Sequence, residues 1–480
     1  MPLILPGNVG SATAGGFNVA NSCRFDGSSA YMHKTPGSAG NTKLWTWSAW
    51  IKKSLPDGAD LGIFGQYIDA NNFFRIRYRS DQRLQVDNYT SGSATFSVIL
   101  GSNNEHRDIS AWYNLVVAYD SAQGTDSNRV KIYVNGVLQT VFQAATYPSQ
   151  NVVTTLPVDG TPIELGRTTD SQFFNGYFAE VVLIDGTALA PTSFGEFDED
   201  SGIWKPINVS GLTFGTNGFY LEFKGSGTSA NASGMGADTS GNTNHFAVNN
   251  LTAIDQSTDT CTNNFATWNS LIKTTATFSE GNLKYAQPGS NPVFGSLSTI
   301  GVTSGKWYAE LNYTSGSSHK LVLGVADETF QNGNTTASYD LGKSGTTSSI
   351  AYVVNTGAYR INNSNTSWGS AGGDGQIINM AIDRDNGKIY FGVNGTWGNS
   401  SNPASNSGGI PTTALDSSTN WFWGITADTS GTSDVGELNF GSPSFAISSG
   451  NTDGDGYGNF EYAVPSGYYS LNTKNLAEYG

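Results

Sequence analysis

Two tryptophans stand in polar surroundings that suit the recognition of a sugar. Trp368 lies in the loop 362–370, which is otherwise built from Asn, Ser, Thr and Gly and includes Asn365, while Trp397 follows Asn394-Gly395. An aromatic face can stack on the apolar face of a sugar ring, and nearby amides can bind its hydroxyl groups. Trp368, Trp397, Asn394 and Asn365 are therefore glycan-binding candidates. The alternative is that each indole ring packs onto the core of its own domain.

Acidic residues at 196–200 offer a different chemistry. Hydrolysis of a glycosidic bond needs two carboxylates on one face, and Glu196, Asp198 and Asp200 alternate as they would along a β-strand. The segment follows residues 190–194, however, a turn with the signature of a helix start. We expect a solvated acidic loop rather than a catalytic centre, and we predict that the protein is not an enzyme.

Oxygen ligands at alternating positions also occur near the end of the chain. Asp453 and Asp455 resemble the start of a calcium-binding loop. An EF-hand loop that starts at Asn451 would need Glu at its twelfth position, and this chain has Tyr462 there. A plain turn rich in Asp and Gly is the first expectation, with calcium at Asp453 and Asp455 as the alternative.

The sequence offers little other metal or disulfide chemistry. Segment 69–72 is a weaker calcium candidate, and the four histidines lack the spacing of a zinc site, so no further cofactor is predicted. Cys23 and Cys261 lie far apart in sequence. They could form a disulfide, but two small buried thiols are the preferred interpretation for a chain without evidence of an oxidising compartment.

The formal net charge of −15 argues against two classes of partner. With 24 Lys and Arg against 39 Asp and Glu, the chain lacks the basic surface that drives binding to nucleic acids or anionic membranes. Its first seven residues have no basic region and only a short apolar run, so they do not predict a signal peptide, and no segment approaches spanning length. We expect neither nucleic-acid binding nor membrane insertion.

The pattern of apolar residues predicts an all-β chain. Strands of alternating apolar residues run into Asn135-Gly136 and Asn394-Gly395, the residue pair that favours a type I′ hairpin turn. Because one such hairpin lies in each half of the chain, we predict two antiparallel β-sandwich domains of jelly-roll type in tandem. The tryptophans within strand patterns are predicted core residues: Trp45, Trp47, Trp50, Trp307 and Trp421.

Composition divides the chain into five parts. Residues 1–19 form an N-terminal arm, whose apolar residues Leu3, Ile4, Leu5 and Val9 suit insertion into a partner. The predicted parts after the arm are a sandwich at 20–205, a connector with added strands at 206–275, a sandwich at 276–465 and a C-terminal tail at 466–480. The connector is rich in Gly, Ser and Asn, so protease is expected to cut it first, between Gly225 and Gly241.

Each predicted sandwich resembles a known family. The first resembles a laminin-G-like, concanavalin A-type jelly roll in segments 25–31, 45–51, 112–117, 134–136, 163–166 and 176–181. The second resembles a SPRY domain in segments 306–310, 323–327, 382–383, 389–397, 423–425 and 436–441. This pairing, preceded by the apolar segment 3–9, looks like structural proteins of tailed bacteriophages from aquatic environments.

The resemblance implies a non-enzymatic virion protein, either a tail fibre or a surface appendage. Its sandwiches would bind host cell-surface polysaccharide or neighbouring virion proteins, and SPRY domains are known as binding modules. The arm would anchor the protein to the virion, and copies would assemble around a symmetry axis, most simply as a trimer, which shields the apolar arm residues. The alternatives are a capsid-surface decoration protein with purely structural contacts and a glycan-cleaving depolymerase.

Overall fold

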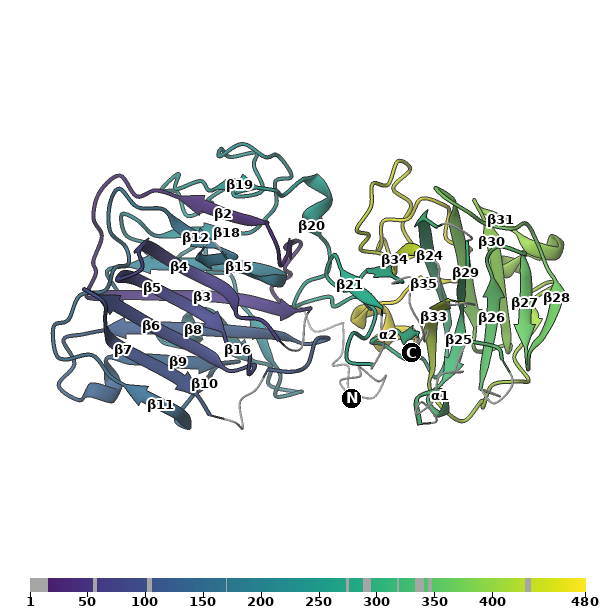
Figure 1. Ribbon diagram of the computed structural model, residues 1–480, viewed down its shortest axis with the longest axis horizontal. Helices are drawn as coiled ribbons and strands as arrows, with labels where there is room; N and C mark the ends of the chain where they lie inside the picture. The colour runs from purple at the N-terminus through teal and green to yellow at the C-terminus, as the bar shows by residue number, and fades with distance from the viewer. Residues whose placement is uncertain are drawn as a thin grey trace. The chain divides into compact units, whose positions relative to one another are not determined.

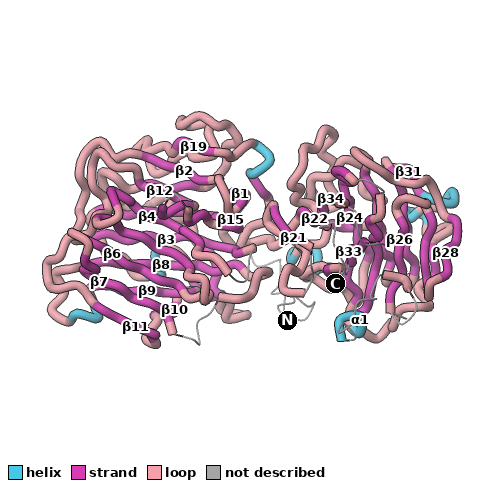
Figure 2. The backbone as a smooth tube through the Cα atoms, in the orientation of Figure 1, coloured by secondary structure: helices cyan, strands magenta, loops and turns pink. Residues whose placement is uncertain are grey.

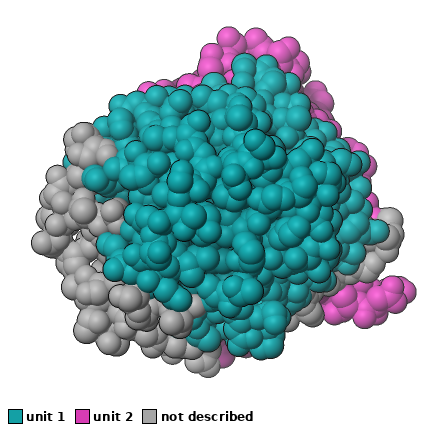
Figure 3. Space-filling view, turned by 90° about the vertical axis from the view of Figure 1, so that its right-hand side faces the viewer, with its two compact units in different colours: residues 1–14, 263–480 teal, residues 15–262 magenta. Residues whose placement is uncertain are grey.

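The chain folds into two β-rich units. The computed structural model describes residues 16–54, 58–101, 106–169, 171–272, 276–287, 295–316, 319–332, 341–343, 348–427 and 433–480. One unit is Gly15–Thr262, the N-terminal sandwich, and the part from Asn263 to Gly480 is the C-terminal sandwich (unit 2 and unit 1 of Figure 3). Strands and loops make up nearly all of both (Figure 2). The predicted all-β fold of two antiparallel sandwiches in tandem is confirmed.

Two eight-stranded sheets build the N-terminal sandwich (Figure 1). Sheet one contains β1 (Ser22–Asp26), β3 (Leu44–Lys53), β8 (Trp112–Asp120), β9 (Val130–Val134), β10 (Val137–Leu138), β15 (Asn175–Asp185), β18 (Phe219–Leu221) and β20 (Gln256–Ser257). Sheet two has the order β11 (Phe142–Thr146), β7 (Ser93–Leu100), β6 (Leu84–Thr90), β5 (Asn72–Tyr78), β4 (Leu61–Asp69), β12 (Ile163–Leu165), β2 (Tyr31–Lys34) and β19 (Ala247–Asn249).

Shorter elements complete this unit. Two small hairpins pair β13 (Arg167–Thr169) with β14 (Gln172–Phe173) and β16 (Gly195–Phe197) with β17 (Trp204–Pro206). Single 3₁₀ turns lie at η3 (Asp126–Asn128), η4 (Pro191–Ser193) and η5 (Ala253–Asp255).

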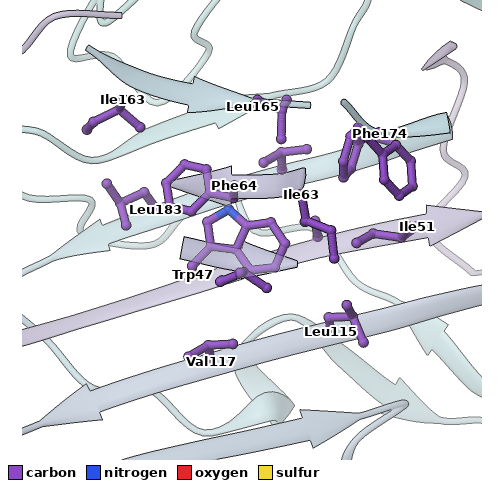
Figure 4. Close-up of a cluster of buried hydrophobic side chains, with 14 of the residues drawn as sticks. Trp47, Ile51, Ile63, Phe64, Leu115, Val117, Ile163, Leu165, Phe174 and Leu183 are labelled. Atoms are coloured by element: carbon purple, nitrogen blue, oxygen red, sulfur yellow. The ribbon is translucent and has the colours of Figure 1, made fainter. Parts of the chain in front are cut away.

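Alternation along the strands fills the core between the two sheets. Trp47 of sheet one stacks on Phe64 of sheet two with ring centroids 5.3 Å apart, and Trp45 meets Phe74 edge to face at 5.0 Å. Figure 4 shows Trp47 and Phe64 among aliphatic side chains from both sheets. All five tryptophans predicted to lie in a core are buried, with at most 4% exposure.

Both predicted Asn-Gly hairpins are present. Asn135 and Gly136 have φ of 47° and 77° between β9 and β10, and Asn394 and Gly395 have φ of 48° and 76° in the other unit. Two successive positive φ angles are the signature of a type I′ turn, whose twist matches that of the flanking strands.

The C-terminal sandwich has a nine-stranded and a six-stranded sheet. The larger contains β21 (Thr277–Ser279), β22 (Lys284–Ala286), β24 (Lys306–Ser315), β29 (Ile377–Asp383), β30 (Lys388–Val393), β31 (Thr396–Trp397), β32 (Ile410–Pro411), β34 (Val435–Asn439) and β35 (Tyr469–Ser470). The smaller has the order β23 (Ser296–Leu297), β33 (Trp421–Ala427), β25 (Leu321–Asp327), β26 (Ser349–Val353), β27 (Ala358–Ile361) and β28 (Ser364–Ser367). The short helices are α1 (Thr329–Asn332), α2 (Thr473–Tyr479), η6 (Gly398–Ser400) and η7 (Pro403–Ser405).

The chain end belongs to this second core, which corrects the predicted tail at 466–480. Strand β35 pairs in parallel with β24, and Leu471 and Leu476 are buried with 0% and 1% exposure. Asn472 caps α2, since its side chain accepts a hydrogen bond from the Asn475 N–H at 3.0 Å. None of the described helices is long and apolar enough to cross a membrane.

The predicted connector at 206–275 is also wrong as a separate part. Strands β18, β19 and β20 pair with β15, β2 and β1, so most of the segment completes the N-terminal sandwich. The stretch 225–241, expected to be the weakest point, holds Met235, which is fully buried with its Sδ 3.2 Å from the Cys23 Sγ. Sparse apolar residues suffice here because they enter a core that other segments supply.

The predicted arm is shorter than expected at its C-terminal end. Phe17 and Val19 pack against Trp50, Trp112 and Tyr177, and Val19 is only 3% exposed. Leu3, Ile4, Leu5 and Val9 lie outside the described residues, so their anchoring role stays a prediction.

Truncation tests this domain boundary. A fragment of residues 16–262 should unfold cooperatively, whereas 16–205 should not, because it loses a set of buried core residues: Phe219, Leu221, Phe223, Met235, Phe246 and Leu251. Each such side chain contributes roughly 1.5–3 kcal/mol, and a domain has only about 5–15 kcal/mol of net stability. Thermal unfolding followed by circular dichroism checks this. Equal unfolding midpoints for the two fragments would support the prediction of a separate connector at 206–275.

Candidate functional site

One side of sheet two is free of any apolar layer within the described part of the chain. The outer side of sheet one is covered by two buried clusters, one around Phe194 and Phe214 and one around Trp50 and Trp204. No such cluster includes the residues of sheet two that alternate with its core positions, such as Arg75, which is flanked by the buried Phe74 and Ile76. We call this side of sheet two the open face.

An aromatic row crosses the open face. Tyr67 of β4 lies opposite Phe73 of β5, Phe73 lies opposite Tyr89 of β6, and Tyr89 lies opposite Ala94 of β7. The ring centroids are 6.0 Å apart for Tyr67 and Phe73 and 4.6 Å apart for Phe73 and Tyr89, with interplanar angles of 27° and 20°. Both pairs are stacked, and the middle ring, Phe73, is only 7% exposed. Ala94 is too small to cover the outer face of Tyr89, which is therefore the ring surface left for a ligand.

A charged row runs beside the aromatic one. Arg75 donates from Nε and Nη2 to the two oxygens of Asp87, at 2.9 and 3.0 Å, and its guanidinium carbon lies 4.7 Å from the centroid of the Phe73 ring. In the same row Gly65 stands between Arg75 and Glu164, so no side chain projects there. Glu164 pairs with Arg167 beyond it.

Polar side chains border both rows. Arg77 donates to Gln85 Oε1 from Nε at 3.1 Å and from Nη2 at 2.9 Å, and it also pairs with Asp60. Beyond Glu164, the guanidinium carbon of Arg167 lies 3.7 Å from the ring centroid of Tyr31. A face with flat aromatic, guanidinium and amide groups fits a sugar chain, whose rings have an apolar side and a polar rim.

Tight turns hold the aromatic row in register. Asp69 Oδ1 accepts the Asn71 N–H at 2.7 Å and the Asn72 amide at 3.0 Å, which closes the turn between β4 and β5. Ser91 and Gly92, with φ of 53° and 76°, form the turn between β6 and β7. The weaker calcium candidate at 69–72 is thus an Asx turn that places Tyr67 opposite Phe73.

The strands that carry this face were predicted from the sequence, but the face itself was not predicted as a site. The signal was the alternation of Phe73, Arg75 and Arg77 with Phe74, Ile76 and Tyr78, which predicts one face of aromatic and arginine side chains. It does not predict that Tyr67 and Tyr89 on neighbouring strands meet Phe73, because that depends on strand register.

Trp368 is not available to a ligand, which corrects the glycan-binding prediction for this residue. The side chain is only 6% exposed, its Nε1 donates to the Phe391 carbonyl at 2.9 Å, and Tyr359 packs edge to face at 5.9 Å. Gly398 makes room for the ring, since a Cβ there would lie 2.3 Å from the indole. Although the loop around Trp368 is polar, the indole packs against residues that lie far along the chain, at Phe391 and Gly398.

The other three predicted glycan-binding residues differ in how accessible they are. Trp397 is partly exposed and meets Tyr308 and Tyr390 edge to face at 6.3 and 6.4 Å, so part of its ring remains open to a ligand. Asn394 is exposed, but its Oδ1 accepts the Ile377 N–H at 2.9 Å and so serves the hairpin. Asn365 is exposed on the edge strand β28.

The acidic segment 196–200 forms part of a hairpin. Glu196 lies in β16 and Asp198 follows it, and Lys205 of β17 pairs with them at 3.4 and 3.1 Å. Asp198 also accepts the Ser201 N–H and hydroxyl, each at 2.9 Å, and these bonds lower its pKa to about 2. Asp200 is exposed in the turn.

Asp453 is occupied by hydrogen-bond donors, which argues against a calcium site there. Its Oδ1 accepts the Asp455 and Tyr457 N–H groups at 3.0 and 2.9 Å. Its Oδ2 accepts the N–H and hydroxyl of Ser470 at 2.9 and 2.6 Å and the Asn475 amide at 2.8 Å. A cation would have to displace these donors from a side chain with 6% exposure. No group of three or more His, Cys, Asp or Glu suited to a metal occurs among the described residues.

The two cysteines are free thiols. Cys23 is buried and Cys261 is partly exposed, so the preferred interpretation of unpaired thiols is confirmed, although Cys261 is less buried than expected.

Glu180 is a buried acidic side chain that was not among the residues predicted to matter. It lies at an irregularity in β15 with φ of 50°, is 7% exposed and accepts a hydrogen bond from the Tyr220 hydroxyl. Burial raises its pKa to about 7, the Tyr220 hydrogen bond opposes that rise, and the nearby Glu222 adds to it. Glu180 is therefore protonated under mildly acidic conditions.

Comparison with known proteins identifies the fold of the N-terminal sandwich. Residues 26–192 match the sequence model of the concanavalin A-like lectin/glucanases superfamily, which confirms the predicted concanavalin A-like, laminin-G-like lectin fold. No curated protein matches the sequence.

Similar solved structures include a SPRY domain, a pentraxin and a protein described as carbohydrate-binding. The SPRY domain of human HERC1 is 14% identical over 36% of this chain and 96% of its own, with a TM-score of 0.29. A heptameric SAP-like pentraxin from Limulus polyphemus is 14% identical over 36% of this chain and 80% of its own, with a TM-score of 0.27. A provisionally assigned carbohydrate-binding protein from Bacteroides ovatus is 15% identical over 48% and 58%, with a TM-score of 0.32. None of these similarities says what this chain binds.

The Asp453 network predicts a calcium-independent C-terminal sandwich. Asp453→Asn should destabilise it by about 2–4 kcal/mol, because an amide group would point two hydrogens at existing donors in a buried site. The exposed Asp455→Asn is the matched control and should cost less than about 0.5 kcal/mol. Thermal unfolding with calcium or with a chelator should give equal midpoints. If calcium raises the midpoint of the unaltered protein but not that of Asp453→Asn, this assignment is wrong.

Glu180 predicts a pH dependence of stability. Its pKa is about 7 in the folded chain and about 4.3 when unfolded, so its contribution is complete below pH ~4 and is lost as pH rises through ~7. The free energy of unfolding of the N-terminal sandwich should fall by about 1–3 kcal/mol between pH ~5 and pH ~8 from this group. Glu180→Gln, which retains an acceptor for Tyr220, should remove that part of the dependence in urea unfolding. Identical pH profiles for both proteins would show that Glu180 titrates normally.

Proposed function

We propose that this protein is a non-enzymatic virion component that binds host surface polysaccharide through the open face of its N-terminal sandwich. The observation that carries the proposal is the aromatic and arginine rows on that face of a lectin-like fold. Tyr89 offers a ring surface that the small Ala94 does not cover. Next to it, Arg75 provides a polar group, and Gly65 has no side chain that would obstruct a ligand.

A binding role agrees with the state of the carboxylates considered for hydrolysis. Glu196 and Asp198 both pair with Lys205, and Glu196 lies on an exposed hairpin outside the two large sheets. Retaining or inverting hydrolysis needs two carboxyl groups facing one sugar linkage from a binding cleft. The depolymerase alternative would require the segment 196–200 to supply both.

The virion setting rests on the resemblance to structural proteins of tailed bacteriophages. In this setting residues 1–15 anchor the protein to other virion proteins, since Phe17 and Val19 already belong to the sandwich. Copies assemble as a trimer around the anchoring point, so that several open faces act together on one polysaccharide. The protein is then a fibre or surface appendage that attaches the particle to its host.

Loss of the Tyr89 ring tests the proposed function. Tyr89→Ala in the full chain should weaken binding to host surface polysaccharide about 10–100-fold, the effect of removing one stacking ring worth ~1–3 kcal/mol. Biolayer interferometry on immobilised polysaccharide measures this. The matched control is Phe197→Ala, which removes a 51% exposed aromatic ring from the β16–β17 hairpin of the same sandwich and should have no effect.

Other outcomes would favour the alternatives. Loss of binding in Trp397→Ala but not Tyr89→Ala would move the site to the C-terminal sandwich. Release of reducing ends that Glu196→Gln abolishes would establish a depolymerase, and a chain that binds no polysaccharide would be a decoration protein.

A further inference from the structure

The hydrogen-bond acceptors at the centre of the open face are already in use. Asp87 is fully buried and accepts two hydrogen bonds from Arg75 and a third from Gln85 Nε2 at 3.2 Å. Gln85 Oε1 accepts two hydrogen bonds from Arg77, and Asp60 accepts from Arg77 and from the Ser80 N–H. A ligand on this face therefore finds few free acceptors among these side chains.

Donors, in contrast, remain available. Nη1 of Arg75 makes no hydrogen bond to any described residue, and neither do the hydroxyl groups of Tyr67 and Tyr89. The Arg75 side chain is 13% exposed. A Tyr hydroxyl can donate or accept, but Nη1 of Arg75 can only donate, so this guanidinium favours a ligand that accepts hydrogen bonds.

The geometry of Arg75 narrows the ligand class further. A guanidinium has three edges, and Asp87 occupies the one formed by Nε and Nη2. The edge between Nη1 and Nη2 makes no hydrogen bond to any described residue, and its two parallel N–H groups match the two oxygens of a planar carboxylate. Contact with the Phe73 ring and the bond to Asp87 fix the guanidinium plane before a ligand arrives. Little side-chain entropy is then lost on binding.

We infer that the open face selects polysaccharides that carry carboxylates, with a uronate carboxylate on the free edge of Arg75 and the adjoining sugar ring against Tyr89. This inference rests on the proposed function and names its substrate class. Each arginine on the face already has an acidic or amide partner, so the site is not a broad basic patch. One carboxylate at one guanidinium edge is recognised, and the salt dependence of binding corresponds to about one ion pair.

The test compares a carboxylated polymer with its carboxyl-reduced form and with a sulfated polymer. The full chain is measured against polygalacturonate, against the same polymer after chemical reduction of its carboxyl groups, and against dextran sulfate. We expect polygalacturonate to bind at least about tenfold more tightly than the reduced polymer. Equal affinity for both, or equally tight binding of dextran sulfate, would overturn the carboxylate selectivity.

A charge-conserving variant locates the selectivity. Arg75→Gln combined with Asp87→Asn leaves the net charge at −15 and leaves no buried carboxylate without a partner. This double variant should bind polygalacturonate as weakly as the unaltered protein binds the reduced polymer. Its affinity for the reduced polymer should equal that of the unaltered protein. Lys131→Gln, on β9 of sheet one, is the control for loss of a positive charge and should behave as the unaltered protein. A double variant that still prefers polygalacturonate would exclude Arg75.

The same series separates the two proposals. If Tyr89→Ala weakens all polymers equally while carboxyl reduction has no effect, only the selectivity is wrong. If host surface polysaccharide is bound but polygalacturonate is not, the selectivity is likewise wrong. If host surface polysaccharide is not bound, or if Tyr89→Ala does not change that binding, the proposed function itself fails. Should the double variant unfold, the comparison of native and reduced polymer on the unaltered protein still decides the selectivity.

Discussion

The cross-strand register of sheet two is the constraint on which the site depends. Phe64, Ile76, Val86 and Val98 lie opposite one another on β4 to β7 and are buried. Because successive side chains point to opposite sides of a strand, this buried row determines which residues form the rows on the open face. A slip of one residue in β5 would place Arg75 in the core and Phe74 in solvent. The free energy that fixes the core therefore also aligns Tyr67, Phe73 and Tyr89.

The strands and hairpins could be predicted from the sequence because their signals are local. Alternation and the Asn-Gly turns identified β8, β9, β29 and β30 as strands. The fate of Trp368 depended on Gly398 and on the Phe391 carbonyl, which lie 23 or more residues away. The connector looked unable to bury a core by its composition, yet Phe219 and Met235 only complete one. Non-local packing of this kind leaves no mark on a local pattern.

Buried carboxylates join segments that are distant in sequence. Asp453 binds Ser470 and Asn475, and so fixes the helix at the chain end. Glu310 is fully buried and accepts the N–H groups of Glu461 and Tyr462 at 2.9 and 2.8 Å, together with the Tyr308 hydroxyl at 2.9 Å. Such groups explain why an acidic residue in a loop predicts metal or catalysis poorly: backbone N–H groups compete for the same oxygens.

We propose the open face of the N-terminal sandwich as the place where polysaccharide binds. A crystal structure of the full chain with a bound galacturonate oligosaccharide tests this most directly. We predict sugar density across β4, β5 and β6, with one ring against Tyr89 and one carboxylate at Nη1 and Nη2 of Arg75. Density confined to the C-terminal sandwich beside Trp397, or to the hairpin that carries Glu196, would contradict it.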